Sequence, residues 1–388
     1  MNRTRIAQLS TGSSGGAALA AKRLNKELVS RKISSEFLQN PHGLMITQKH
    51  LTSKAATGIQ GYLTREPYGI ASPFSISKVD RDSLIRNFDV VHIHNWYNLL
   101  SLEDICYIGN RVPIVFAMHD ERLLSGGCHM TLGCNNFIQT CKDCPAVTLG
   151  KPFISKAKIS ISEVLMQLPE FSVVTPSHWI KEQWGLAYPN LANLALQIPN
   201  IIEHPTKGSF EFDQNESLEI VFISANLSAP VKGLTNLLKA LAMSHLSSKI
   251  KLNLVGRGNL KSLPTNLNIK FYGELASQEV YTVMAKSDLL VVPSFSENSP
   301  NVIAEAQLLG LPVLASNVGG IPELIENGVT GFLTEPDEES LGSALLELIH
   351  KPNFPEISKN ASRFAQNHWN NDVNVLRYMN VYQKASNL

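Results

Sequence analysis

The sequence has 388 residues, of which 44% are hydrophobic and 17% charged, and its formal net charge at pH 7 is +1. This is the composition of an ordinary globular chain long enough for two domains with separate cores, and it lacks the basic excess of a nucleic-acid-binding protein. The N-terminal residues contain no apolar stretch typical of a signal peptide, and no apolar run is long enough to cross a bilayer. We therefore expect a cytoplasmic protein.

In the first half of the sequence, short β-branched runs alternate with amphipathic stretches, the pattern of a parallel sheet covered by helices. Residues 5–10 predict a strand that enters a glycine-containing turn and then a helix from about residue 17 to residue 30. Further strands are expected at residues 88–96, 112–120 and 171–177.

The second half repeats the pattern, with strands expected at residues 218–224, 251–256, 269–273, 288–294 and 312–316. Proline, glycine and polar residues interrupt the periodicity at residues 198–217, and the last part of the sequence has helical period without strands. The predicted fold class is α/β, with two Rossmann-like doubly wound domains at residues 1–200 and 201–365, and a C-terminal helix at residues 366–388.

Ligands of doubly wound sheets bind beyond the carboxyl ends of the strands, so residues that directly follow strands are the candidates for a site. Gly15 and Gly16 could let backbone N–H groups approach a phosphate, but they do not fit the spacing G-x-G-x-x-G, and a tight turn explains them as well. His119 could face a cleft or serve as a hydrogen-bonded structural residue. His92 and His94 share one face of a strand without a third metal ligand nearby, which favours packing.

Lys232 follows the strand at residues 218–224 and precedes a glycine and a helix, where a lysine can deliver a point charge to a phosphate. On most surfaces such a lysine is only solvated.

The segment "SENSPNVIAEAQLLG", residues 296–310, carries two glutamates on either side of an expected helix start. Ser299 suits the N-cap, Pro300 the first helical position, and Gly310 the end of the helix. Glu297 then lies in the loop before the helix, and Glu305 lies one turn beyond Asn301 on the edge of the apolar stripe. Carboxylates and a helix N-terminus together suit a ligand with hydroxyl groups and a phosphate, whereas the alternative is a capped helix with two solvated acids.

Residues 291–333 resemble the donor-site signature of retaining GT-B glycosyltransferases of the GT4 type, with Glu297 and Glu305 as the E-x7-E pair. The resemblance extends to residues 15–28, 118–120 and 231–233 and to the C-terminal helix. It implies two Rossmann-like domains facing a cleft, with the acceptor bound by the N-terminal domain and the sugar nucleotide by the C-terminal domain. The last helix is then expected to pack back on the N-terminal domain.

The resemblance also implies residue roles. Glu297 would hold donor-sugar hydroxyls, Lys232 would neutralise the diphosphate, and His119 would lie beside the anomeric centre. Donor-binding residues would further be Gly15, Gly16, Asn298, Ser299, Pro300, Asn301 and Glu305, the last at the nucleotide ribose. The arginine that usually precedes the lysine is missing, since residues 225–227 read Ala-Asn-Leu, and Arg257 is a substitute at an unusual position.

The function implied is that of a retaining hexosyltransferase-type enzyme, without a catalytic metal, that transfers a sugar from a nucleoside-diphosphate sugar to a glycan or polyprenyl-linked acceptor. Such enzymes act in exopolysaccharide or lipopolysaccharide synthesis, at the inner face of the cytoplasmic membrane. The alternatives are a sugar-nucleotide epimerase and a catalytically silent sugar-nucleotide-binding protein. A nicotinamide oxidoreductase fits less well, because the glycine turn lacks the dinucleotide fingerprint.

Four cysteines lie in an insert at residues 125–145: Cys128, Cys134, Cys141 and Cys144. The spacing of the last two, C-x-x-C, allows two thiolates to share one tetrahedral zinc, and four thiolates would close a structural site. His129 could replace one of them. A redox pair would leave two cysteines idle and lacks the expected strand-then-helix setting, and four unrelated thiols are improbable at this density. Some enzymes of the GT4 type carry a similar insert, and Cys106 is expected only to pack.

Overall fold

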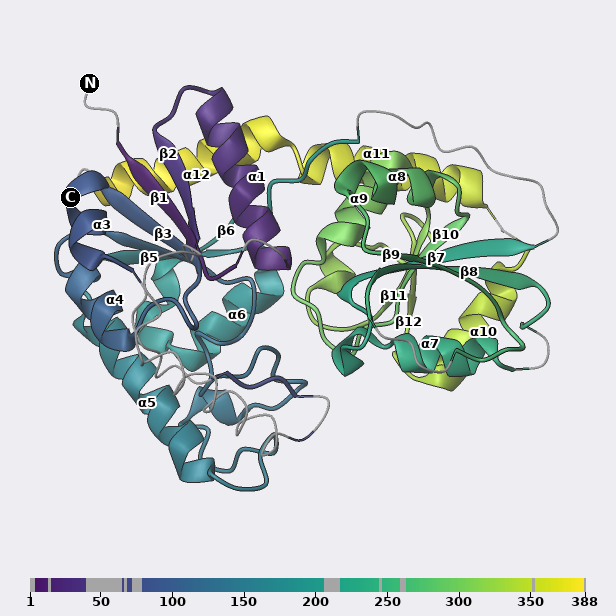
Figure 1. The fold of residues 1–388 in the computed structure, drawn as a ribbon, viewed down its shortest axis with the longest axis horizontal. Helices are drawn as coiled ribbons and strands as arrows, with labels where there is room; N and C mark the ends of the chain where they lie inside the picture. The colour runs from purple at the N-terminus through teal and green to yellow at the C-terminus, as the bar shows by residue number, and fades with distance from the viewer. Residues whose placement is uncertain are drawn as a thin grey trace. The chain divides into compact units, whose positions relative to one another are not determined.

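The computed structural model describes residues 4–12, 15–39, 65, 68–71, 79–205, 217–243, 246–258, 263–350 and 353–386. The chain divides into two compact units, of which unit 1 comprises Met1–Ile201 and Asn371–Leu388 and unit 2 comprises Ile202–Asn370. Each unit is built around its own six-stranded sheet (Figure 1). The predicted α/β class with two doubly wound sheets is confirmed.

The sheet of unit 1 has the strand order β2-β1-β3-β4-β5-β6, and every strand pair is parallel. Its strands are β1 (Ile6–Ser10), β2 (Ser35–Gln39), β3 (Val90–Asn95), β4 (Ile114–Ala117), β5 (Phe171–Thr175) and β6 (Ala195–Gln197). Its helices are α1 (Gly16–Ser30), α3 (Arg81–Asn87), α4 (Leu102–Gly109), α5 (Lys151–Gln167), α6 (His178–Ala187) and α12 (Asn371–Ser386).

Helices cover both faces of this sheet, as its almost continuously apolar strands require. On one face, α1 and α12 lie side by side (Figure 1), and Leu24, Leu28 and Val381 pack with Ile6 and Val115 of the sheet. Helices α4 and α5 contribute to the larger apolar cluster of this unit. The last helix of the chain is therefore part of the core of unit 1.

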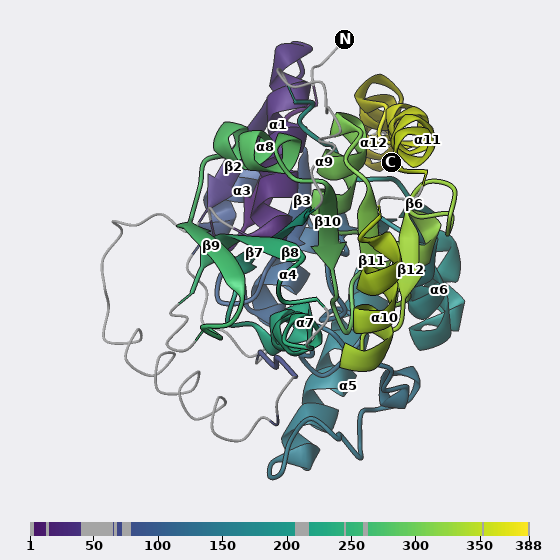
Figure 2. The same cartoon turned by 90° about the vertical axis from the view of Figure 1, so that its right-hand side faces the viewer.

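The sheet of unit 2 has the order β12-β11-β10-β7-β8-β9 and is likewise parallel throughout. Its strands are β7 (Leu218–Asn226), β8 (Ile250–Arg257), β9 (Asn268–Gly273), β10 (Leu289–Val292), β11 (Val313–Ser316) and β12 (Phe332–Thr334). Its helices are α7 (Leu234–Leu241), α8 (Ser277–Ala285), α9 (Asn301–Leu309), α10 (Glu338–Leu348) and α11 (Phe354–His368). Helices α8 and α9 cover one face of the sheet, and α7 and α10 cover the other (Figure 2).

Local differences from the predicted elements are small. Helix α9 begins at Asn301, one residue later than predicted, because Pro300 has an extended ψ of 116°. Pro300, and not the predicted Ser299, is therefore the N-cap. Its predicted end is confirmed, since Gly310 adopts the left-handed conformation with φ 80°. The edge strands β2, β6 and β12 were not predicted. No helix in the described part of the chain is long and apolar enough to span a membrane.

Tyr382 fastens α12 to the sheet through buried hydrogen bonds. Its hydroxyl accepts from Nε2 of Gln8 at 3.1 Å and lies 2.7 Å from Nδ1 of His92. We predict that Tyr382→Phe lowers the free energy of unfolding by about 1–3 kcal/mol, because buried polar atoms lose their partner. Urea unfolding measures this, with Tyr378→Phe as the control, since the Tyr378 ring stacks on Tyr382 but its hydroxyl is outside these contacts. Equal losses in the two variants would contradict the prediction.

Candidate active site

The sheet of unit 2 places two loops side by side at its centre. Strand β7 is the first strand of the unit and lies between β8 and β10, so the chain leaves it toward one side and later returns on the other. This is a topological switch point, where the loops after the two central strands diverge and leave a crevice. Lys232 lies in the loop after β7, and Glu297 lies in the loop after β10.

Lys232 and Glu297 form an ion pair at this point. The distance from Nζ to Oε1 is 2.5 Å, and the hydroxyl of Ser294 donates to the same oxygen at 3.0 Å. Glu297 is only 6% exposed, and a buried carboxylate is costly unless a cation or donors satisfy it. The side chain of Lys232 keeps 32% of its surface exposed, so its positive charge is both held and open to a ligand.

Two glycines fix the loops around this pair. Gly233 has φ 74°, and a Cβ there would lie 1.8 Å from the carbonyl oxygen of Pro293. Gly319, in the loop after β11, has φ 58°, and its Cβ would lie 1.9 Å from the carbonyl oxygen of Glu297. Side chains at either position would push the loops apart, so glycine is required for the close approach that forms the ion pair.

The remaining donor-site residues predicted in this unit lie on the same loop or on α9. Asn298 is 2% exposed and Glu305 is 8% exposed, and Ser299, Pro300 and Asn301 are partly exposed. The N-terminus of α9, with its partial positive charge, directly follows Glu297 and its loop. Arg257 ends β8, the neighbour of β7, and its Nε lies 3.4 Å from an oxygen of Glu274, with both side chains more than half exposed.

In unit 1, the predicted glycines open the turn after β1. Gly15 has φ 91° and precedes α1, and a Cβ on either Gly15 or Gly16 would meet no atom within 4 Å. Packing against the described residues therefore does not explain why position 16 is a glycine. The space next to this backbone suits a close approach by a ligand.

His119 follows β4 and belongs to a line of polar side chains. Its Nε2 lies 2.9 Å from Nδ1 of His94, whose Nε2 lies 2.7 Å from Oε1 of Gln8. Through Tyr382 the line reaches His92, as described above. Sequence reasoning assigned His92 and His94 to packing and missed Gln8 and Tyr382. Only the alternation of two histidines in the strand signalled a polar cluster.

Burial holds these histidines uncharged. It lowers the pKa of His92 to about 3 and that of His94 well below its ordinary value, with nearby histidines adding to both effects. It also lowers the pKa of His119 to about 4, although the Asp120 carboxylate acts in the opposite direction. All three side chains are therefore neutral imidazoles at pH 7.

The four cysteines of the insert line one small cavity together with Tyr68 and Phe137. All four are free thiols. The pKa of Cys144 is lowered to about 6 by a hydrogen bond from Cys128 and by the backbone N–H groups of Ala146 and Val147, against the effect of burial. Among the described residues, however, no group of three or more His, Cys, Asp or Glu side chains stands in a geometry that could hold a metal ion.

Lys158 of α5 lies beside the cysteine cluster. It is 2% exposed, its Nζ lies 3.8 Å from the centroid of the Tyr188 ring, and it has no hydrogen-bond partner within the described residues. Burial lowers its pKa to about 8, while Cys141 acts to raise it. A buried ammonium without a hydrogen-bond partner is costly. Sequence reasoning missed Lys158 because one lysine on an amphipathic helix usually points to solvent.

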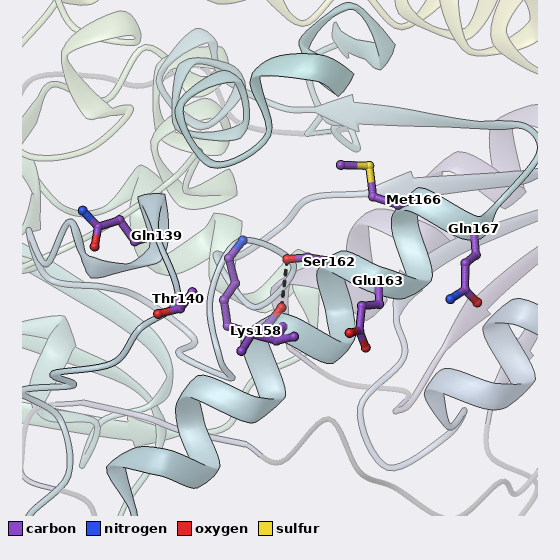
Figure 3. Close-up of a pocket in the computed structure, with 8 residues that line it drawn as sticks. Gln139, Thr140, Lys158, Ser162, Glu163, Met166 and Gln167 are labelled. Carbon is purple, nitrogen blue, oxygen red and sulfur yellow. Dashed lines mark hydrogen bonds between the residues drawn. The ribbon is translucent and has the colours of Figure 1, made fainter.

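A pocket lies along the same helix (Figure 3). It is lined by Gln139, Thr140, Lys158, Ile159, Ser162, Glu163, Met166 and Gln167. The Ser162 hydroxyl donates to the carbonyl of Lys158, one helical turn earlier. None of the predicted site residues lines this pocket, so the chemistry is better sought at the strand ends.

Part of unit 2 matches a known protein family. Residues 218–351 match the family model described as glycosyl transferases group 1. An uncharacterized 41.2 kDa protein in the cps region of Klebsiella pneumoniae is 29% identical over 173 residues, which are 44% of this chain and 47% of that protein. N-acetyl-alpha-D-glucosaminyl L-malate synthase of Bacillus anthracis is 26% identical over 338 residues, 83% of this chain and 81% of the synthase.

A solved structure matches the chain over almost its full length. HepE from Anabaena, in complex with UDP, has 18% sequence identity and a TM-score of 0.64, covering 98% of this chain and 100% of that one. The alignments with the first curated relatives span less than half of those proteins. The chain thus has the GT-B fold, and its unit 2 carries the group 1 glycosyltransferase match.

The buried histidines generate a prediction about acid stability. Because the pKa of His92 is lower in the folded protein than its ordinary 6.5, the unfolded chain binds the proton more readily, and the stability from this group falls as the pH drops below 6.5. We expect His92→Phe to reduce the pH dependence of the unfolding free energy by about 1.4 kcal/mol per pH unit between roughly pH 6 and 4.

Urea unfolding of the wild type and His92→Phe at several pH values measures this slope. The pKa of Glu121, which burial raises to about 7, contributes with the opposite sign, but it does so in both proteins and cancels in the comparison. Parallel pH profiles would show that His92 does not carry this linkage.

Proposed function

We propose that this protein transfers a sugar from a nucleoside-diphosphate sugar to a hydroxyl of a glycan or polyprenyl-linked acceptor, with retention of anomeric configuration. The observation that carries the proposal is the Lys232–Glu297 pair at the switch point of the unit that matches the glycosyltransferase family. A partly exposed cation near a helix N-terminus suits a diphosphate, and a buried carboxylate suits sugar hydroxyls.

In this reaction the bond between the anomeric carbon and the phosphate oxygen breaks, and a bond to the acceptor oxygen forms. The acceptor proton passes to the departing phosphate, so no protein base is required. The developing charge on the nucleoside diphosphate is met by Lys232 and by the N–H groups at the start of α9. Glu305 is assigned to the nucleotide ribose, and the backbone groups from Asn298 to Asn301 are assigned to the sugar together with Glu297. From unit 1, Gly15 and Gly16 are assigned to the phosphates and His119 to the sugar.

The ion pair itself suggests how the donor is received. In the described structure, the ammonium of Lys232 is paired with the carboxylate of Glu297. When a diphosphate pairs with Lys232, the carboxylate of Glu297 becomes free to accept hydrogen bonds from the sugar hydroxyls. The diphosphate and the sugar of the donor then each bind one member of the former ion pair. We also propose a role in exopolysaccharide or lipopolysaccharide synthesis at the inner face of the cytoplasmic membrane. One relative, itself uncharacterized, is described as a protein in the cps region of Klebsiella pneumoniae.

We further propose that the cysteine insert binds a structural zinc ion. Four thiols around one cavity are the ligand set of a closed zinc site, and the buried ammonium of Lys158 would offset the net negative charge of a zinc tetrathiolate. Binding then requires the thiols to close around the ion. The N–H groups that point at Cys144 suit a thiolate in the bound state.

Two substitutions test the donor site. Lys232→Ala is expected to lower transfer by roughly 10²–10³-fold and to weaken nucleoside-diphosphate binding, because the phosphate charge loses its cation. Glu297→Gln is expected to lower transfer to a similar degree but to leave nucleoside-diphosphate binding equal or tighter, since it removes the competing carboxylate. Lys239→Ala is the control, because this exposed lysine pairs with Glu338 on the surface.

The measurement is a thermal-shift panel of UDP-, GDP- and ADP-sugars, followed by mass spectrometry of products with candidate acceptors and by nucleoside-diphosphate release. Near-normal turnover in either site variant would remove that residue from the mechanism. Donor binding without transfer across many acceptors would favour a silent binding protein, and epimerised donor without release of nucleoside diphosphate would favour an epimerase.

Metal analysis of protein purified without chelators tests the zinc proposal. We expect about one zinc per chain, lost in Cys134→Ser and Cys141→Ser and retained in Cys106→Ser, whose thiol lies on α4 next to Gln167. If the protein is free of metal and forms a Cys128–Cys144 disulfide on mild oxidation, the zinc proposal is wrong and the two cysteines are a redox pair.

A further inference from the structure

The hydrogen bonds that lead from His119 into unit 1 have a single direction. Gln8 decides it, because an amide has one side that only donates and one that only accepts. Its Nε2 donates to the hydroxyl of Tyr382 at 3.1 Å, so its Oε1 accepts from Nε2 of His94 at 2.7 Å. The proton of His94 is therefore on Nε2.

The state of His119 follows from that of His94. A neutral His94 with its proton on Nε2 has a bare Nδ1, which can only accept. Nε2 of His119 lies 2.9 Å from this atom, and the two ring centroids lie 5.2 Å apart with the ring planes inclined by 14°. His119 must donate here, which leaves its Nδ1 without a proton.

The same direction continues to the far end of the line. Having accepted from Gln8, the Tyr382 hydroxyl donates to Nδ1 of His92 at 2.7 Å. The proton of neutral His92 is then on Nε2, a buried atom that has no partner among the described residues. The four inner side chains are each at most 5% exposed, whereas His119 is partly exposed. Four buried side chains thus lie behind His119, the partly exposed end of the line.

A charged pair lies at this outer end. Asp120 adjoins His119 and forms an ion pair with Arg122, whereas the inner members of the line lie on β1, β3 and α12. Among the described members of the line, His119 is the one that is partly exposed to solvent. The arrangement therefore resists conversion of His119 to an imidazolium at neutral pH.

We propose that His94, Gln8 and Tyr382 are positioning residues that hold His119 as the neutral tautomer with its proton on Nε2, so that Nδ1 accepts a hydrogen bond from a substrate hydroxyl. The substrate part of this inference rests on the proposed glycosyl transfer. The tautomer does not, because it is a property of the protein without ligand. The role of His119 is then to orient a hydroxyl group and not to supply a proton.

The tautomer is measured directly by nitrogen NMR of the full-length protein labelled with ¹⁵N at histidine, with the His119 signals identified by their loss in His119→Gln. At pH 7 we expect one tautomer, with Nδ1 of His119 in the chemical-shift range of a bare nitrogen and Nε2 in that of a protonated one. The opposite tautomer, an equal mixture or an imidazolium would each overturn the proposal.

Two substitutions at His94 separate positioning from packing. His94→Asn keeps an oxygen that can accept from His119, whereas His94→Leu removes the acceptor at similar volume. We expect the single tautomer to persist in His94→Asn and to become a mixture in His94→Leu. We also expect kcat to fall roughly tenfold in His94→Leu with little change in KM, and to recover in His94→Asn. An unchanged tautomer in His94→Leu would exclude the positioning role.

The two readouts keep the proposals apart. A protein with the expected tautomer that transfers no sugar would remove the proposed function and the substrate hydroxyl, and would leave the positioning of His119 established. A protein that transfers sugar while His119 has the other tautomer would support the proposed function and exclude the proposed positioning of His119.

Discussion

The buried carboxylate of Glu297 is the constraint around which unit 2 is arranged. An ionised group with 6% exposure is tolerated only next to a cation, and that cation is carried by a loop 65 residues earlier in the sequence. The pairing requires β7 and β10 to be neighbours, and it requires Gly233 to bring the two loops together. The strand order and the position of Gly233 are thus both needed for the ion pair. The loop that carries Glu297 also sets where α9 begins.

Unit 1 also buries polar groups, but along the line from His119 they are neutral side chains joined by hydrogen bonds. Buried polar side chains of β1, β3 and α12 form a neutral line from His119 to His92, and burial keeps the pKa of each histidine low. The difference suits the chemistry proposed for each unit. A departing diphosphate gains negative charge and is stabilised by a fixed cation, whereas an anomeric carbon with oxocarbenium character is better placed beside a neutral hydrogen-bonding group than beside an imidazolium.

The sequence was sufficient for features that depend on short segments. The strand periodicity gave the fold class, and Gly310 gave the end of α9. Strands β2, β6 and β12 were missed because they are short edge strands of three to five residues with few fully buried side chains. Contacts across the chain were also out of reach. Gln8 and Tyr382 are 374 residues apart, and nothing in the period of either segment indicates that they share a hydrogen bond.

The cysteine insert is connected to His119 by the core of unit 1. Cys141, Cys144 and Phe137 belong to the same apolar cluster as Phe116 of β4, the strand that His119 follows. Glu121, two residues beyond His119, is fully buried, and its carboxylate accepts from the N–H and the hydroxyl of Thr131 within the insert at 2.8 Å each. The turn that carries His119 is therefore bound to the insert at one end and to the histidine line at the other. A metal ion that orders the insert would act on the reaction through the position of this turn, at a distance from the reacting atoms.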